Sequence, residues 1–270
     1  MKNLKKMSFA FAVSTALILS ACGKDSKTSG SENQKPLRVV TDAAYAPFEY
    51  LDKGKIVGFD VDFTNAVAKE AGLKIDIVNV GWDPLFAEVG DKLADIGMSS
   101  ITINDDRKIK YDFTVPYFLS TNKILVPEGS DIKSAEDLKG KVVAVQNGTT
   151  GQEAVESLLG KNSKDVKKFE NNNLAILELK SGGADAVVAD NAVVETYAKN
   201  NPNEKLVVIE DKDSFAAEFY GLMLPKGSKY KEKLDKAVKE VVENGTYEEI
   251  YKEHFGTEPD LETLTAEQNK

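Results

Sequence analysis

The chain has 270 residues, and its 35 Lys and Arg against 44 Asp and Glu give a formal net charge of -9, which excludes a basic nucleic-acid-binding surface. Hydrophobic residues make up 41%, enough for a buried core, whereas a mean hydropathy of -0.33 argues against a chain that crosses a membrane many times. One cysteine and one histidine exclude a disulfide framework and a Cys/His zinc site, and we expect no metal, no cofactor and no nucleic-acid partner.

The first residues are typical of an export signal. Three lysines precede an apolar run over residues 9–19, which is too short to span a bilayer. Cys22 follows directly, in the order Leu, Ser, Ala, Cys, which resembles the lipobox of bacterial lipoproteins. We therefore expect a signal peptide over residues 1–21 and a lipid on Cys22. The alternative is ordinary cleavage with a cysteine nearby by chance.

Residues 22–36 are expected to tether the protein. From Gly23 to Lys35 the chain contains only glycine and polar or charged residues, a composition typical of a flexible linker. A lipid on Cys22 would then anchor the protein to the outer face of the bacterial cell membrane.

From Leu37 onward, strand and helix patterns alternate. Short runs of β-branched and other apolar residues predict strands at 37–41, 75–80, 96–101, 123–126, 141–146, 186–189, 206–209 and 220–224. Helical patterns lie between them at 61–71, 151–159, 174–181 and 192–199. This alternation indicates an α/β fold with largely parallel sheets.

The C-terminal part predicts two helices and a polar end. Apolar residues between Leu234 and Val242 fall on one helical face, and Asn244 with Gly245 is a typical stop signal. A second helix is expected over 246–255. Residues 258–270 are polar and are expected to fray as a tail.

The sequence lacks the common catalytic motifs. It contains no P-loop, no dinucleotide fingerprint and no GxSxG motif. His254 lies in the last predicted helix, where we expect it at the surface or partly packed. Asp60 and Asp62 are expected to cap a helix that begins near Val61, and not to act as an acid/base pair. We therefore expect no catalytic residue.

Loops that follow strands carry most of the polar groups of interest. They span residues 41–49, 81–86, 98–107, 146–152 and 183–191. In this order and at these separations they resemble the family 3 extracellular solute-binding proteins, the polar amino-acid receptors of ABC importers, over about residues 37–255. The runs TDAAYAPFEY, GWDPLF and VQNGTTGQE are most similar to lipid-anchored receptors for arginine, lysine or histidine.

The resemblance implies a two-lobe fold of the type II periplasmic-binding-protein kind. Residues 37–116 with 221–257 would form lobe 1, and residues 122–215 would form lobe 2. Two strands would cross between the lobes near 117–121 and 216–220. The ligand would be held between the lobes as they close.

Some residues in these loops can pair with the charges of a free amino acid. Burying its carboxylate or its ammonium unpaired would cost several kcal/mol. Arg107 is the only arginine in the loops and can hold a carboxylate with two parallel hydrogen bonds, and Asp190 can accept from the ammonium. Further donors are expected from Ser99, Ser100, Thr102, Thr149 and Thr150, the last two at the start of a helix. Alternatively, Arg107 pairs with Asp105 or Asp112 at the surface, and Asp190 caps the next helix.

The remaining loop residues favour a basic ligand. Tyr45 and Trp82 are expected to flank the ligand's side chain, and Asp42 to accept from its distal cation. Similar glutamine receptors tend to carry a lysine where this chain has Gln146, and a lysine there would neutralise Asp42. Glu218, near the second crossing strand, could add a negative charge.

Other functions remain open at this point. A glutamine or other polar amino-acid receptor of the same type is one alternative, and an exported cyclohexadienyl dehydratase, a sensor or an adhesin are others. The favoured interpretation is a monomer, not an enzyme, whose partners are a free basic amino acid, a membrane ABC permease and, through a lipid, the membrane itself.

Overall fold

The computed structural model describes residues 35–270 as one compact unit. The predicted signal peptide, the lipidated Cys22 and nearly all of the predicted tether lie outside the described residues. Within 35–270, no helix is both long enough and apolar enough to cross a membrane.

Lobe 1 is built on a five-stranded sheet with the order β5-β1-β6-β14-β7. Its strands are β1 (Leu37–Thr41), β5 (Ile75–Asn79), β6 (Ile96–Gly97), β7 (Tyr111–Phe113) and β14 (Met223–Pro225). Strand β1 runs parallel to β5 and β6, while β14 pairs antiparallel with β6 and β7. A small three-stranded sheet joins β2 (Ala44–Tyr45), β3 (Glu49–Asp52) and β4 (Lys55–Val57).

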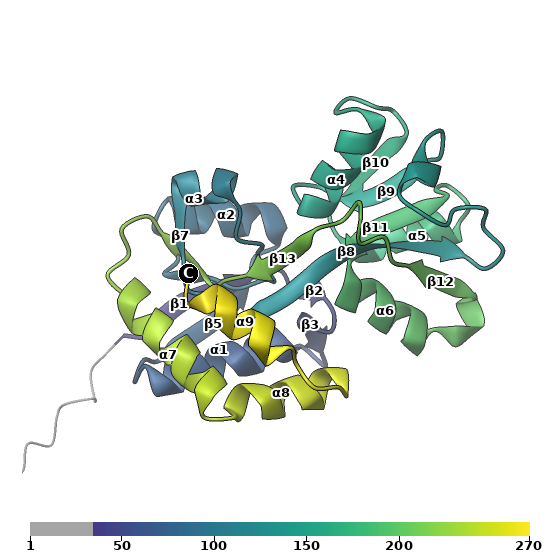
Figure 1. Cartoon of the computed structure of the whole chain (residues 1–270). Helices are drawn as coiled ribbons and strands as arrows, with labels where there is room; N and C mark the ends of the chain where they lie inside the picture. Colours follow the sequence, from purple (N-terminus) through teal and green to yellow (C-terminus); the bar gives the residue numbers. More distant parts are fainter. Residues whose placement is uncertain (1–34) are drawn as a thin grey trace, which may run out of the picture. The chain divides into compact units, whose positions relative to one another are not determined.

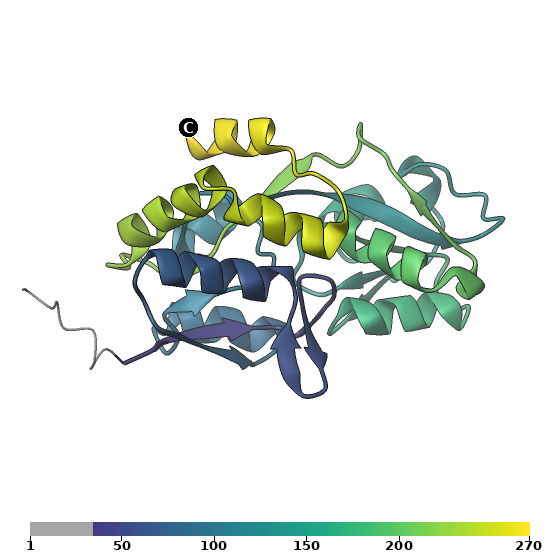
Figure 2. The same ribbon diagram turned by 90° about the horizontal axis from the view of Figure 1, so that it is seen from below.

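Helices cover both faces of this sheet. The helices are α1 (Phe59–Glu70), α2 (Trp82–Gly90), α3 (Asp105–Lys110), α7 (Lys231–Glu243) and α8 (Thr246–Phe255). Val39 of β1 packs in one core with α1, α7 and α8, whereas Val40 packs on the opposite face with α2. Figure 2 shows α1, α7 and α8 grouped on the same side of lobe 1. The alternation along β1 therefore buries both faces of the sheet.

Lobe 2 contains a sheet with the order β10-β9-β11-β8-β12. Its elements are β8 (Phe118–Pro127), β9 (Val143–Gln146), β10 (Val166–Phe169), β11 (Ala186–Asp190), β12 (Leu206–Ile209), α4 (Thr150–Leu159), α5 (Asn172–Lys180), α6 (Asn191–Asn200) and the 3-10 helices at Glu136–Leu138 and Pro202–Glu204. Strands β9, β10 and β11 are parallel, whereas β8 runs antiparallel to β11 and β12. This layered arrangement confirms the predicted α/β fold class.

Two strands connect the lobes. Phe118, at the start of β8, belongs to the core of lobe 1, and the rest of β8 pairs within the sheet of lobe 2. Strand β13 (Ala217–Tyr220) runs antiparallel beside this first part, with Tyr220 opposite Phe118 and Ala217 opposite Thr121. Figure 1 shows β8 and β13 side by side between the lobes.

Two predicted strands differ from the structure. The run 96–101 is a strand only at Ile96–Gly97, because the chain then turns at Ser100, which has a positive φ of 48°. The run 220–224 is divided between β13 and β14. The first difference occurs beside the cavity described below, which Ser99 and Ser100 line.

The C-terminal segment is also different from the prediction. Instead of a frayed tail, it forms α9 (Leu261–Gln268), with the Asp260 side chain accepting from Thr263 N at 3.0 Å. Leu264 is buried, and Gln268 Nε2 donates to the carbonyl of Pro116 at 2.7 Å. Leu264, the partly buried Leu261 and long-range hydrogen bonds at Gln268 and Asn269 therefore hold a segment whose composition is mainly polar.

The predicted capping role of Asp60 and Asp62 is wrong. Helix α1 begins at Phe59 after Gly58, and no side chain caps it. Asp60 is fully buried, and its carboxylate accepts hydrogen bonds from Ser100 N and Tyr117 OH. His254 lies in α8, where its Nε2 is 2.7 Å from Asp62 Oδ2, as expected for a partly packed surface residue.

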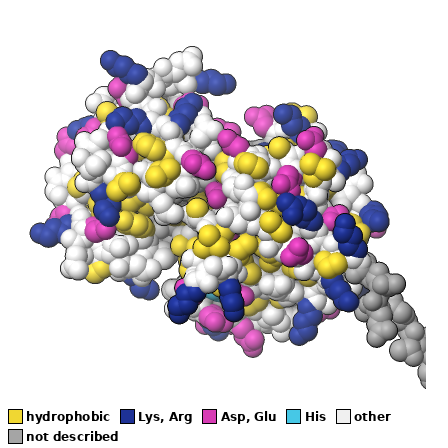
Figure 3. All heavy atoms as spheres, turned by 180° about the vertical axis from the view of Figure 1, so that it is seen from behind, with side chains coloured by type: hydrophobic (Ala, Val, Ile, Leu, Met, Phe, Trp, Pro, Cys, Tyr) yellow, Lys and Arg dark blue, Asp and Glu magenta, His cyan; other side chains and the backbone are white. Residues whose placement is uncertain are grey.

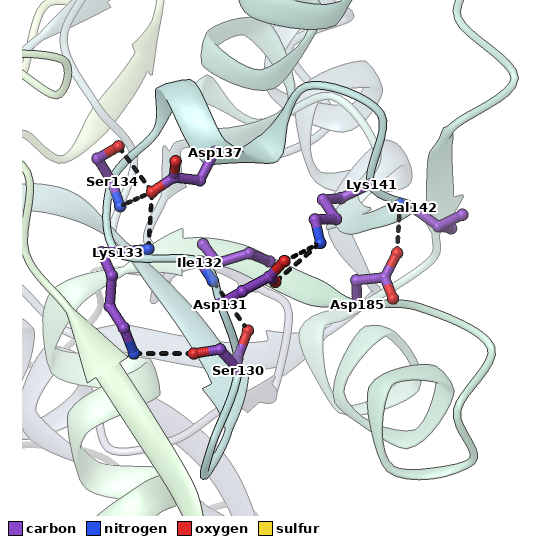
Figure 4. A network of polar contacts seen from close by, with 9 residues as sticks. All are labelled: Ser130, Asp131, Ile132, Lys133, Ser134, Asp137, Lys141, Val142 and Asp185. Carbon is purple, nitrogen blue, oxygen red and sulfur yellow. Dashed lines mark hydrogen bonds and ion pairs between the residues drawn. The ribbon is translucent and has the colours of Figure 1, made fainter.

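Polar networks away from the cavity have a structural role. Figure 4 shows one in the β8–β9 connection, where Asp137 accepts from the backbone N–H groups of Lys133 and Ser134, and Lys141 pairs with Asp131. Figure 3 shows charges of both signs interspersed over one face of the molecule. Such mixed surfaces are ordinary for a soluble domain and mark no binding site by themselves.

Candidate functional site

A cavity of about 20 Å³ lies where the two lobes meet. It is lined by Tyr45, Trp82, Ser99, Ser100, Thr102 and Arg107 from lobe 1, and by Gln146, Thr149, Thr150 and Asp190 from lobe 2. The structure thus brings together every predicted ligand residue except Asp42. This volume holds about one water molecule, so the lining side chains fill most of the space between the lobes.

Arg107 is placed by a short capped helix. Asn104 Oδ1 accepts from Arg107 N at 2.9 Å and fixes the start of α3. The guanidinium donates from Nη1 to Thr102 O at 2.8 Å and from Nη2 to Gly148 O of lobe 2 at 3.3 Å. It also lies 5.7 Å from the ring centroid of Trp82, within the range of a cation–π contact.

Arg107 makes neither of the surface ion pairs considered from sequence. Asp105 pairs with Lys108, and Asp112 with Lys226. Burial lowers the pKa of Arg107, and the negative charges of nearby carboxylates, Glu153 first, oppose this effect. A guanidinium stays protonated under such conditions, so it presents a fixed positive charge to the cavity.

Asp190 supplies the opposite charge from lobe 2. It precedes α6, but its side chain makes no capping hydrogen bond. Its carboxylate is buried and accepts from Tyr220 OH at 2.6 Å and from Tyr45 OH. Burial, with a contribution from Glu218, raises the pKa of Asp190 to about 6, while the tyrosine hydrogen bonds and Arg107 act in the opposite direction. The carboxylate is therefore ionised at pH 7 but easily protonated below pH 6.

The start of α4 faces the same cavity. Thr149 caps it, with its side chain accepting from Gln152 N at 3.2 Å, while its hydroxyl donates to Gln146 O at 2.9 Å. The first N–H groups of a helix have no partner within the helix and carry its positive dipole end. Thr150 is the first residue of α4, so this helix end adds donors for an anion.

Glu218 on β13 connects both lobes, a role that the sequence suggested only as an added negative charge. Its carboxylate accepts from Thr102 Oγ1 of lobe 1 at 2.7 Å and from Thr150 Oγ1 of lobe 2 at 2.8 Å. Asn122 Nδ2 donates to it as well, at 2.8 Å. The hydroxyls of Thr102 and Thr150 are thus already engaged, so their backbone N–H groups are the better candidates for ligand donors.

Asp42 lies just behind the cavity wall. It is buried, and Gln146 Nε2 donates to its carboxylate at 3.4 Å, while Gln146 Oε1 accepts from Asn172 Nδ2 at 3.0 Å. Burial raises the pKa of Asp42 to about 6, against the lowering effect of Gln146. A ligand would reach this carboxylate only where Gln146 shifts aside or shares it.

Direct contacts between lobes hold the cavity closed. Besides the Tyr45–Asp190 and Arg107–Gly148 contacts, Asn173 Nδ2 of α5 donates to Ala44 O at 3.1 Å. A ligand larger than water can enter only if these contacts break and the lobes separate. The arrangement can then close again on a small molecule that carries both signs of charge.

The roles of several residues at the site were not predicted from the sequence. Tyr220 donates to Asp190 from a strand predicted only as β-rich, and Glu49 and Asp60 lie behind the Ser99–Ser100 turn. Tyr220 could have been found from the pairing of the two crossing strands. Asp60 carried no local signal of this role, because charged residues near a helix start are usually caps.

The whole domain matches one protein family. The family model for bacterial extracellular solute-binding proteins, family 3, matches residues 37–257. The chain belongs to this family. Membership confirms the resemblance found in the strand-end loops and implies an extracytoplasmic protein.

Individual relatives of this family 3 protein carry related names. A probable histidine-binding protein of Neisseria gonorrhoeae is 43% identical over 262 residues, 95% of this chain and 97% of the relative. The arginine-binding extracellular protein ArtP of Bacillus subtilis is 34% identical over 88% of this chain and 92% of the relative. A solved structure is also similar, that of the arginine-, lysine-, histidine-binding protein ArtJ from Geobacillus stearothermophilus. The two chains are 57% identical with a TM-score of 0.84, and the match covers 86% of this chain and all of that one.

Proposed function

We propose that the protein is the substrate-binding lipoprotein of an amino-acid ABC importer and that it binds a basic L-amino acid between its two lobes. The observation that carries this proposal is the pair of opposite charges, Arg107 from lobe 1 and Asp190 from lobe 2, on one cavity. A zwitterion that touches both can stabilise only the closed form, so binding favours closure.

The α-carboxylate of the ligand would bind on the Arg107 side. The guanidinium would exchange its bonds to Thr102 O and Gly148 O for two parallel bonds to the carboxylate. The N-terminus of α4 would add backbone donors from the other lobe.

The α-ammonium would bind to Asp190. It would replace Tyr45 OH as a donor to this carboxylate, while Tyr220 OH keeps its place. The ammonium brings a full positive charge into a buried acidic environment that includes Glu218, so it lowers the pKa of Asp190 and holds it ionised.

The preference for a basic side chain rests on Asp42 and the aromatic walls. Tyr45 and Trp82 flank the cavity, and Asp42 lies next to Gln146 at its edge, with no lysine to neutralise it. Arginine or lysine would leave no buried charge unpaired, whereas glutamine would offer Asp42 only a neutral amide. The names of the three relatives agree with this choice.

The remaining features of the proposal lie partly outside the described residues. We propose a lipid on Cys22, cleavage of residues 1–21, a tether over 22–36 and delivery of the ligand to a membrane permease by a monomer. For the lobes we propose the bounds 37–116 with 221–257 and 122–215.

A thermal-shift screen with all twenty amino acids, followed by calorimetry, tests this function. A ligand at a hundred times its Kd adds about 2.7 kcal/mol to the free energy of unfolding, which corresponds to a rise in Tm of roughly 5–10 °C. We expect this rise for arginine and lysine, little for glutamate, and recovery of the bound amino acid chemically unchanged. A larger rise with glutamate, or none with any amino acid, would contradict the proposal.

Asp42→Asn tests the basic preference. We expect the variant to bind arginine about tenfold more weakly and glutamine about as well as the wild type, because a hydrogen bond to a charged group contributes about 1.5–3 kcal/mol. Isothermal titration with both ligands measures the difference. An equal loss for both ligands would argue that Asp42 only supports the fold.

The pH dependence of binding provides a second test of the role of Asp42. Asp42 and Asp190 both have a pKa of about 6 in the ligand-free protein, and a cationic ligand needs both ionised. From pH 7 to pH 5, arginine affinity should therefore fall about tenfold per carboxylate. Glutamine depends on Asp190 alone, so its affinity should fall about half as steeply on a logarithmic scale. In Asp42→Asn, the arginine profile should take the slope of the glutamine profile.

A further inference from the structure

Two buried carboxyl groups lie directly behind the cavity, and the binding scheme does not use them. Glu49 of β3 and Asp60 of α1 are both fully buried. In the described part of the chain neither forms an ion pair, and Glu49 Oε2 and Asp60 Oδ1 are buried without a hydrogen-bond partner. No group of acidic, His or Cys residues in this part is arranged to hold a metal ion either.

The backbone brings the two segments that carry these groups together. Phe59 N donates to Pro47 O at 3.1 Å, and Asp60 N donates to Phe48 O at 2.9 Å, so the start of α1 lies against the segment before Glu49. Gly58 permits this approach, because a Cβ atom there would collide with the carbonyl oxygen of Phe48. The backbone therefore keeps the two segments adjacent, and the two side chains bind consecutive residues, Glu49 at Ser99 and Asp60 at Ser100.

Two ionised carboxylates in such a place would repel each other without any compensating cation. When two carboxyl groups share a buried site, one of them holds a proton. A proton between Glu49 Oε2 and Asp60 Oδ1 satisfies both unpartnered oxygens with one hydrogen bond. It also reduces the buried charge of the pair from two to one.

The hydrogen bonds indicate which group is the acid. Asp60 Oδ2 accepts from Ser100 N and from Tyr117 OH, both at 2.8 Å, which favours its ionised form. Glu49 Oε1 accepts from Ser99 Oγ at 2.7 Å. Burial, together with the negative charge of Asp60, raises the pKa of Glu49 well above its usual value.

The other ionisable groups around the pair act in the same direction or are neutral. Asp42 adds a negative charge that further raises the pKa of Glu49. Tyr117 and Tyr247 face Asp60, and burial raises the pKa of both phenols, so they stay neutral.

We propose that Glu49 and Asp60 share one proton and that this acid–carboxylate pair positions the Ser99–Ser100 turn for the ligand. Glu49 holds Ser99, and Asp60 holds the backbone of Ser100, whose positive φ of 48° needs support from its surroundings. Both serines line the cavity, so the pair acts on the ligand through them. The effect on ligand affinity rests on the proposed function, whereas the shared proton does not.

The shared proton is tested on the ligand-free protein with Glu49→Gln. The free energy of unfolding is measured by urea denaturation from about pH 5 to pH 8 for wild type and variant. Because the native state keeps a proton that glutamate, with an ordinary pKa of 4.5, loses on unfolding, the wild-type folding equilibrium constant should fall about tenfold per pH unit relative to the variant. Glu70→Gln, an exposed change at the end of α1, should leave this slope unchanged.

The positioning role is tested with arginine as the probe. The amide that Glu49→Gln introduces can donate to Asp60 and accept from Ser99, so this variant should keep arginine affinity within about threefold of wild type at pH 7. Asp60→Asn replaces the ionised oxygen that accepts from Ser100 N and Tyr117 OH by a neutral amide oxygen, which is a weaker acceptor, and should weaken arginine binding at least tenfold, although the change is equally isosteric.

Distinct results separate the two proposals. Equal stability slopes for wild type and Glu49→Gln would overturn the shared proton, as would a Glu49→Gln variant that does not fold. Carbon-13 NMR of the Glu49 carboxyl in wild type gives an independent reading, and an ionised shift at pH 7 would also overturn it. Equal arginine affinity in Asp60→Asn would overturn the positioning role. Failure of every amino acid to bind the wild type would refute only the proposed function.

Discussion

Arg107→Ala is expected to weaken arginine binding by roughly a thousandfold. The guanidinium is the positive group on the cavity that comes from lobe 1, and Trp82 and Phe86 pack around it. Removing it would leave the ligand's carboxylate desolvated with only backbone donors. Truncating one partner of a buried, hydrogen-bonded charge pair costs about 2–5 kcal/mol. Isothermal titration with arginine and lysine measures the loss.

The chain offers a matched control for this change. Arg38 is the other arginine in the sequence, and it forms a partly exposed pair with Glu88 on lobe 1. Arg38→Ala should leave arginine affinity unchanged, because this pair is outside the cavity. Arg107→Lys keeps the charge but loses the planar fork and should fall between wild type and alanine. If Arg107→Ala bound arginine with wild-type affinity, this result would refute the charge pairing on which the proposed function rests.

The polar loops of the site could be predicted because of how parallel sheets are built. Within one sheet, parallel strands end at the same edge, so Gln146 and Asp190 meet at the edge of the lobe 2 sheet, while Asp42 lies at the corresponding edge of the lobe 1 sheet. Asp42 follows β1, Gln146 ends β9 and Asp190 ends β11, and all three lie at the cavity or directly behind it. The residue types then limited the kinds of ligand that fit the loops, since a zwitterion requires one group of each charge.

The interactions that cross long sequence separations could not be predicted in this way. Glu218 joins Thr102 and Thr150 across separations of 116 and 68 residues, which depend on how the two crossing strands pair. The turn at Ser100 is held by Asp60, 40 residues away. In the sequence, the run that contains Ser100 fits a strand and Asp60 fits a helix cap, so local patterns predicted the wrong role for each.

Helix α9 illustrates the same limit on a smaller scale. Its sequence has a low apolar content, and a frayed end was the natural expectation. The structure orders it through Leu264, buried in the core of lobe 1, and through Gln268 on the carbonyl of Pro116 just before β8. A pattern-based prediction recognises an amphipathic face but not a few contacts with distant parts of the chain.

Asp190→Asn is expected to weaken binding of every amino acid by roughly a hundredfold or more, because the α-ammonium is common to all of them and would lose its only ionised partner in lobe 2 on the cavity. The loss should not discriminate between arginine and glutamine, in contrast to Asp42→Asn. Calorimetry with both ligands measures this. Binding of either ligand at wild-type affinity would show that the ammonium binds elsewhere.

Stability measurements distinguish this effect from a folding defect. The amide oxygen that Asp190→Asn introduces can still accept from Tyr45 and Tyr220, which both donate to one carboxylate oxygen in the wild type. In the wild type, the native pKa of about 6 against an ordinary 3.8 means that the native state binds a proton more tightly than the unfolded state. The free energy of unfolding of the ligand-free wild type should therefore fall from pH 4 to pH 6 relative to the variant and then level off. At pH 7 the ligand-free variant should be at least as stable as the wild type, while arginine should stabilise it much less than the wild type. A variant that is less stable than the wild type at pH 7 would instead assign Asp190 to the fold.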